Sequence, residues 1–229
     1  MYRATAALLS LSVLLTPAMA QNRPPSIDQQ IYPQGRALFN QKKFAEARPL
    51  LSKACASGKW DACDMLTIMY VVGLGGLPAR SSMVGAPFSE AVPVFERACE
   101  RGEAVACSHL GYMYENSVGV AENHANEQTF YSKGCDGGEA FACNELGIEH
   151  DVSCQVRKSA SDCSVAVSLY AKSCDLGFAK GCQLLGSMYH RGAGVERDDV
   201  RAEALFRKAC TAGADGVACK ELENMHRAR

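Results

Sequence analysis

Twelve cysteines are the residues of this chain with the clearest chemical potential. A thiolate can bind a metal or attack a disulfide, and two thiols can pair as a structural disulfide. The chain has no C-x-x-C motif of the kind found in zinc sites and catalytic dithiols, and ten cysteines form pairs with seven or eight intervening residues. We therefore predict structural disulfides between Cys55 and Cys63, Cys99 and Cys107, Cys135 and Cys143, Cys174 and Cys182, and Cys210 and Cys219.

The remaining two cysteines, Cys154 and Cys163, lie between the third and fourth pairs, outside the repeating pattern. They could pair with each other and close their own insertion, or one of them could reach another part of the chain. We predict the local pair. It is the one pair whose lability we would test, because every other first cysteine is expected at a helix C-terminus, where the helix dipole disfavours a thiolate.

The serines, histidines and methionines show no catalytic or ligand spacing. The motifs S-x-x-K, K-T-G, S-D-N, G-x-S-x-G and H-E-x-x-H are all absent, which argues against a serine β-lactamase or a zinc protease. His150 and His226 stand where other copies have tyrosine, so we expect partly buried packing residues. Four methionines share one repeat position, and we expect core packing rather than haem or copper ligation for Met69, Met113, Met188 and Met225.

The residues around each cysteine pair predict two helices that position them. Counting from the second cysteine, a leucine follows at +3 and a tyrosine or histidine at +7, which places them on one helical stripe. Counting from the first cysteine, a bulky apolar residue precedes it by four residues and a glycine follows by three, which is typical of a helix that stops at that glycine. The pairs recur every 36 to 44 residues, a period typical of repeat arrays.

The sequence A-C-x-x-L-G-x-M-Y at Ala106–Tyr114, its close copy at Gly181–Tyr189 and the G-x-G-V turn at Gly192–Val195 resemble the Sel1-like repeat. With the cysteine pairs added, the chain resembles the Helicobacter cysteine-rich protein family over about residues 34–226. The resemblance implies an all-α, TPR-like α/α solenoid of five to six two-helix units, each helix pair stapled by a disulfide.

For function, the resemblance implies a scaffold that binds a protein or an extended peptide. Two alternatives come with it. Members of the cysteine-rich family are described as penicillin-binding proteins with weak β-lactamase activity, so a β-lactamase-like hydrolase is the enzyme class to consider. A mitochondrial relative of similar layout, cytochrome c oxidase assembly factor 7, raises an assembly or redox factor that binds a metal or haem. The missing motifs favour the non-catalytic scaffold, with no cofactor and no metal.

The first 20 residues are expected to be a secretory signal peptide cleaved after Ala20, with Arg3 before the apolar stretch Ala6–Leu15. We expect residues 21–33 to be a disordered leader, residues 34–226 the solenoid and residues 227–229 a tail. No later segment is apolar enough to span a membrane, and a net charge of −1 without a basic, aromatic-rich run argues against nucleic acid. We therefore expect a periplasmic or secreted protein.

Such solenoids bind along a concave face, which we expect to be lined mostly by the helices that begin at the second cysteines. Positions +1, +2 and +5 from those cysteines are predicted to point outward and to offer hydroxyl, amide, carboxylate and apolar groups to a peptide. The candidate partner-binding residues are Ser108, His109, Tyr112, Asn144, Glu145, Ile148, Gln183 and Ser187.

Overall fold

The computed structural model describes residues 27–76, 85, 88–213 and 216–227, so the expected signal peptide lies outside the described residues. Every regular element described is helical, and none of these helices is long and apolar enough to cross a membrane. In chain order they are α1 (Ile27–Asn40), α2 (Phe44–Ala56), α3 (Trp60–Val72), the short 3-10 turn η2 (Leu74–Gly76), α4 (Phe88–Glu100), α5 (Ala104–Glu115), α6 (His124–Asp136), α7 (Ala140–Arg157), α8 (Ala160–Asp175), α9 (Ala179–Arg191), α10 (Asp199–Thr211) and α11 (Val217–Arg227).

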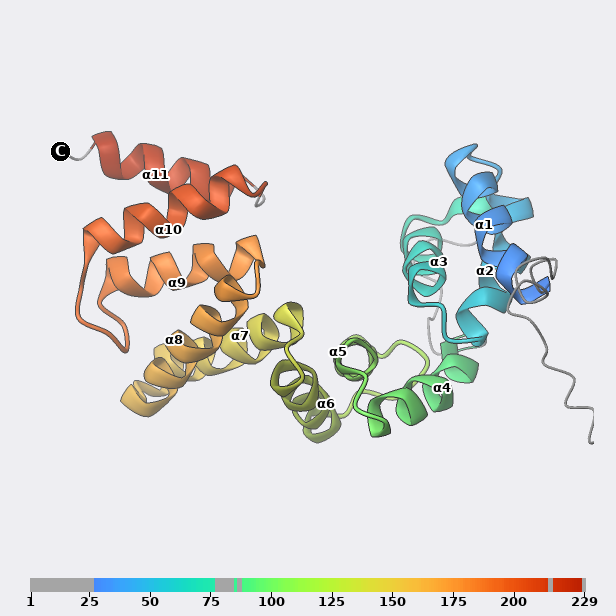
Figure 1. Ribbon diagram of the computed structural model, residues 1–229, viewed down its shortest axis with the longest axis horizontal. Helices are drawn as coiled ribbons and strands as arrows, with labels where there is room; N and C mark the ends of the chain where they lie inside the picture. The colour runs from blue at the N-terminus through green and yellow to red at the C-terminus, as the bar shows by residue number, and fades with distance from the viewer. Residues whose placement is uncertain (1–26, 77–84, 86–87, 214–215, 228–229) are drawn as a thin grey trace, which may run out of the picture.

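The helices alternate between two kinds. We call α3, α5, α7, α9 and α11 the A helices, because each begins just before the second cysteine of a pair. The B helices are α2, α4, α6, α8 and α10, and each contains the first cysteine in its last turn. The most extensive packing joins an A helix to the B helix after it, as in α5–α6, α7–α8 and α9–α10. The pairs stack into an open arc with α1–α3 at one end and α9–α11 at the other (Figure 1), which confirms the predicted α/α solenoid.

Five disulfides join a B helix to the A helix that follows it, and a sixth joins α7 to α8. The predicted pairs all form, with Cα–Cα distances between 4.4 and 4.9 Å: Cys55–Cys63, Cys99–Cys107, Cys135–Cys143, Cys154–Cys163, Cys174–Cys182 and Cys210–Cys219. In the five repeat turns the glycine after the first cysteine has φ between 80° and 93°, a conformation that glycine adopts at little cost. No cysteine of the chain is free.

The repeat positions that were expected to be apolar make the core. At the position four residues before the first cysteine, Tyr131, Tyr170 and Phe206 are each 1% exposed. The shared methionine position is also buried, from 0% exposed for Met69, Met113 and Met188 to 9% for Met225. The methionines are therefore core residues, as predicted.

The first helix corrects one expectation. Helix α1 begins at Ile27, so the disordered leader predicted for residues 21–33 is wrong from residue 27 onward. Ile31 is only 7% exposed, and Leu38, seven residues later on the same helical face, packs against the same core cluster. This apolar stripe is sufficient to dock α1 on α2. The polar residues between its members led to the prediction of disorder.

One A helix differs from the rest. Helix α7 has 18 residues, whereas the other A helices have 11 to 13. Its additional turns carry Cys154, and helix α8 begins three residues after α7 ends and carries Cys163. The sixth disulfide therefore fastens an extension of α7 to the start of α8.

Candidate functional site

The structure places the +1 candidates inside the protein. Ser108 and Asn144 are 2% exposed and Gln183 is 5% exposed, so the prediction that these side chains point outward is wrong. The Ser108 hydroxyl donates a 2.8 Å hydrogen bond to Glu139, the residue that caps α7. The next A helix therefore covers the +1 position, an effect of stacking between units that the pattern of one helix does not contain.

Two other candidates belong to an aromatic cluster between units. The imidazole of His109 stacks on Trp60 with ring centroids 3.9 Å apart, while Tyr112 and Phe95 meet Trp60 edge-on at 5.7 and 5.8 Å. Burial lowers the pKa of His109 to about 4, against an opposing effect of Asp61. These residues hold α3, α4 and α5 together. Ser187 is half-buried.

The last two candidates, Glu145 and Ile148, line a cavity of about 610 Å³ beside the extended part of α7. We call this cavity the α7 groove. Its residues come from the end of α5, the start of α6, residues 145–157 of α7 and the start of α8. They are Glu115, His124, Glu127, Gln128, Glu145, Ile148, Glu149, His150, Val152, Ser153, Val156, Arg157 and Asp162.

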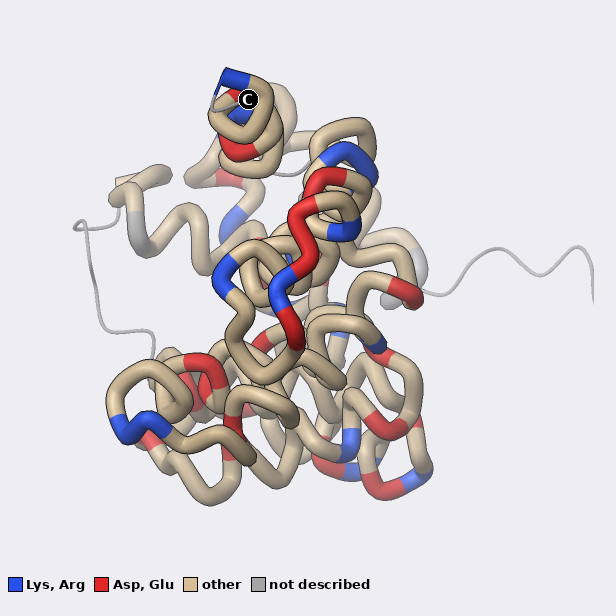
Figure 2. Tube along the Cα trace, turned by 90° about the vertical axis from the view of Figure 1, so that its left-hand side faces the viewer, with Lys and Arg blue, Asp and Glu red and all other residues tan. Residues whose placement is uncertain are grey.

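The groove is acidic. Five of its lining residues are carboxylates, and Arg157 is its one Lys or Arg. Over the described chain as a whole, acidic and basic residues are interspersed (Figure 2), so the groove differs from its surroundings. Burial raises the pKa of Glu145, and the neighbouring charges of Glu115 and Glu127 raise it further, against the Asn144 hydrogen bond and Lys180.

A histidine contacts two carboxylates on one side of the groove. His124 places its Nδ1 2.9 Å from Glu127 and its Nε2 3.0 Å from Glu149, while Gln128 also donates to Glu149. The hydrogen bond to Glu127 and the charge of Glu149 raise the pKa of His124. Glu115 accepts a 2.7 Å hydrogen bond from the hydroxyl of buried Tyr131. Burial, followed by this hydrogen bond, raises the pKa of Tyr131.

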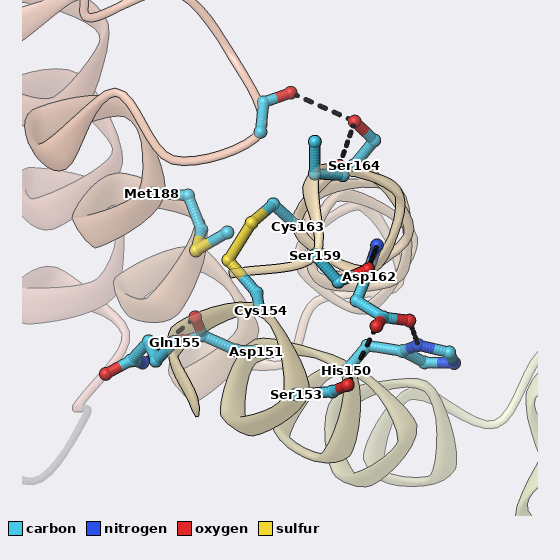
Figure 3. Close-up of a disulfide and its surroundings, with 12 residues drawn as sticks. His150, Asp151, Ser153, Cys154, Gln155, Ser159, Asp162, Cys163, Ser164 and Met188 are labelled. Atoms are coloured by element: carbon cyan, nitrogen blue, oxygen red, sulfur yellow. Dashed lines mark hydrogen bonds and ion pairs between the residues drawn. A yellow bond between two sulfur atoms is a disulfide. The ribbon is translucent and has the colours of Figure 1, made fainter. Parts of the chain in front are cut away.

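Asp162 organises the end of the groove next to the sixth disulfide. Its carboxylate accepts a 2.7 Å hydrogen bond from Ser153 and lies 3.1 Å from His150 Nδ1, and its backbone N–H donates to Ser159, the N-cap of α8. Figure 3 shows this group on one side of Cys154–Cys163 and Met188 on the other. Hydrogen bonds from Ser153, Ser159 and His150 lower the pKa of Asp162 to about 2.

Serine, histidine and aspartate meet here without forming a hydrolytic triad. In a triad the imidazole lies between the serine and the carboxylate, where it takes the hydroxyl proton. Here Asp162 lies between Ser153 and His150, so the Ser153 hydroxyl donates to the carboxylate instead of to the imidazole. This geometry gives the β-lactamase alternative no activated nucleophile at this site.

Two observations concern metal ligation and thiol access in the described part of the chain. Within it, no three His, Cys, Asp or Glu side chains are placed to hold a metal ion. The cysteines of the first, second, third and fourth repeat pairs are each at most 5% exposed, so thiols have no access to these disulfides. Cys163 and the last pair, Cys210–Cys219, are half-buried.

His150 and His226 were both expected to be partly buried, and this is correct for His150 alone. His150, at the repeat tyrosine position, has a side chain that is 36% exposed and contacts Asp162. His226 is exposed, with 50% of its side-chain surface accessible, and it lies 3.0 Å from Glu203. Among the described residues, α11 is the last helix and no described unit covers it.

Sequence reasoning missed the residues that make the groove apolar, Val152 and Val156. Their signal is visible in hindsight, because Ile148, Val152 and Val156 recur every four residues, and Cys143, His150 and Cys154 recur at helical spacing. Both series continue past the point where the other A helices stop. They could have predicted an α7 of 18 residues.

The Sel1 repeat model matches the chain three times, at residues 104–138, 140–178 and 179–213. These matches cover α5 to α10, including the whole α7 groove. They confirm the repeat that the motifs predicted. No curated protein matches the sequence.

Several solved structures have a similar fold. A protective antigen of uropathogenic Escherichia coli with an SLR fold is 25% identical, with a TM-score of 0.57 over 85% of this chain and 40% of that one. A Sel1 repeat protein from Oxalobacter formigenes is 25% identical, with a TM-score of 0.52 over 58% of this chain and 97% of that one. Helicobacter pylori cysteine-rich protein B is 28% identical, with a TM-score of 0.45 over 59% and 94%. This chain spans less than half the length of the E. coli antigen.

Proposed function

The chain is a Sel1-repeat protein, and we propose that it is an exported, non-catalytic scaffold that binds a partner protein or an extended peptide. Sel1 repeats commonly mediate contacts between proteins, which supports binding as the general role. The observation that carries the proposal here is the α7 groove, a cavity of about 610 Å³ with exposed aliphatic side chains on its α7 wall. Exposed aliphatic groups beside a polar rim are typical of a surface that a partner covers.

Export is the second part of the proposal. All twelve cysteines are paired, and disulfides of this kind form and persist in oxidising compartments. The expected signal peptide leads to the periplasm or the cell exterior. N-terminal sequencing of the protein from a periplasmic fraction tests this part, and we expect a mature chain that begins at Gln21. A full-length, reduced protein in the cytoplasm would contradict it.

A photo-crosslinking experiment tests the binding role. A photoreactive residue is placed at Val156 in the groove, which is 75% exposed, or at Val200 on α10, which is 77% exposed. The two positions offer the same side chain and nearly the same exposure, so they differ mainly in location. We expect a discrete protein adduct from Val156 and none from Val200. If neither position gives an adduct, or both give the same set, the groove is not the binding surface.

A further inference from the structure

The wall of the α7 groove contributed by α7 is an aliphatic stripe. Ile148, Val152 and Val156 lie four residues apart, so they share one face of the helix. Val152 is 55% exposed and Val156 is 75% exposed. From Ile148 to Val156 the stripe extends about 12 Å along the helix.

Glutamates from three elements line the same groove. Glu115 lies at the end of α5 and Glu127 in the first turn of α6, and α7 itself adds Glu145 and Glu149. Glu115 and Glu127 repel the charge of Glu145, which Lys180 opposes. His124 contacts Glu127 and Glu149, so the groove contains more carboxylates than cations. Arg157 is the one Lys or Arg in the lining, and it does not form a described ion pair with any of these carboxylates.

We propose that the α7 groove binds an extended segment of a partner protein in which lysine or arginine alternates with aliphatic residues. The inference rests on the proposed function and names its partner chemistry. Side chains of an extended strand alternate between two faces, so one face can meet the aliphatic stripe of α7 and the other can meet Glu115 and Glu127 of α5 and α6. At about 3.3 Å per residue, the 12 Å stripe spans about four residues of such a segment. The ammonium or guanidinium of the partner supplies positive charge and hydrogen-bond donors to the groove carboxylates.

The probe is a fluorescein-labelled octapeptide of alternating lysine and leucine, with binding to the mature, oxidised protein followed by fluorescence polarisation. Two variants test the charge and the aliphatic surface separately: Glu145→Gln removes one charge at constant shape, and Val156→Ser removes aliphatic surface at an exposed site. Their matched controls lie outside the groove, Glu122→Gln on an exposed loop and Val200→Ser on α10. Thermal melting of all four variants confirms that they fold alike.

We expect both groove variants to bind the peptide more weakly than the parent protein, and both controls to bind it with an unchanged Kd. Glu145→Gln is expected to raise Kd about threefold to fivefold, and Val156→Ser about threefold to tenfold. Raising the salt concentration weakens binding to the parent protein more than to Glu145→Gln, because salt screens the charge that the variant lacks.

Three outcomes would overturn it. The first is equal Kd for the parent and both groove variants, or no binding at all. The second is equally tight binding of a peptide in which glutamate replaces lysine. The third is full displacement by spermidine together with no effect of Val156→Ser, which would mean a small polyamine site. None of these outcomes decides the scaffold role itself, which depends on the protein adduct formed at Val156.

Discussion

The imidazole ring of His109 lies on the indole ring of Trp60, with centroids 3.9 Å apart and planes inclined by 15°. The two residues come from α5 and α3, so the stack joins two consecutive A helices. Burial in this cluster lowers the pKa of His109 to about 4 from an ordinary value of 6.5. A residue that looked like a partner contact in the sequence is therefore part of the packing between units.

Protonation of His109 is expected to appear in the fluorescence of Trp60, the only tryptophan of the chain. A protonated imidazole quenches a stacked indole, so the emission should fall with a midpoint near pH 4. Between pH 6.5 and 4 the unfolded chain binds a proton that the folded chain does not, so stability should decline as the pH falls through this window. His109→Gln should remove the fluorescence transition, and His150→Gln should leave it. A midpoint near 6.5 would show that His109 is not buried.

Gly147 on α7 is expected to be indispensable for the contact with α8. A Cβ at this position would lie 2.6 Å from the ring of Tyr170, which is almost fully buried and cannot yield easily. At so short a contact overpacking should cost about 3 kcal/mol, the upper end of its usual range, and the better helix propensity of alanine offsets about 1 kcal/mol, so Gly147→Ala should lower the free energy of unfolding by about 2 kcal/mol. Denaturant unfolding measures this.

Gly186 provides the comparison, because a Cβ there would lie 3.0 Å from the edge of Phe206. Gly186→Ala should therefore cost less than Gly147→Ala. A stability for Gly147→Ala equal to or above that of the parent would mean that α7 and α8 are further apart than described.

Asp162 should make the end of the α7 groove sensitive to acid. Its pKa is lowered to about 2 from 3.8, so its stabilising effect is fully present above pH 3.8 and is lost as the pH falls toward 2. Asp162→Asn should therefore flatten the pH dependence of unfolding in this range. It should have the same pH dependence as the parent above pH 5. Unfolding midpoints across the acid range would test this, and an unchanged slope below pH 3.8 would contradict it.

The repeat made much of the fold predictable from the sequence. Each unit has the same helical register. Alignment of the units with one another therefore predicted the cysteine pairing, the buried aromatic position of Tyr131 and Tyr170, and the buried methionines. Local rules were sufficient here because each contact lies within a unit or across one short turn.

The candidate site was less predictable, because it depends on how units stack. Ser108 looked exposed on its own helix, yet the cap of α7 covers it. The groove arises where α7 departs from the repeat, and the positions that all units share end before Val152 and Val156. Only Glu145 and Ile148, at shared positions, were found.

The central claim is that the extension of α7, fastened by Cys154–Cys163, forms the partner-binding surface. The most direct measurement compares the adduct formed at Val156 in two double variants, Cys154→Ser/Cys163→Ser and Cys210→Ser/Cys219→Ser. Both remove a disulfide with a sequence separation of 9, so both should lose about 2–3 kcal/mol of stability by the chain-entropy estimate. We predict that the adduct is lost in the first variant and retained in the second. Equal adduct in the two variants would contradict the claim.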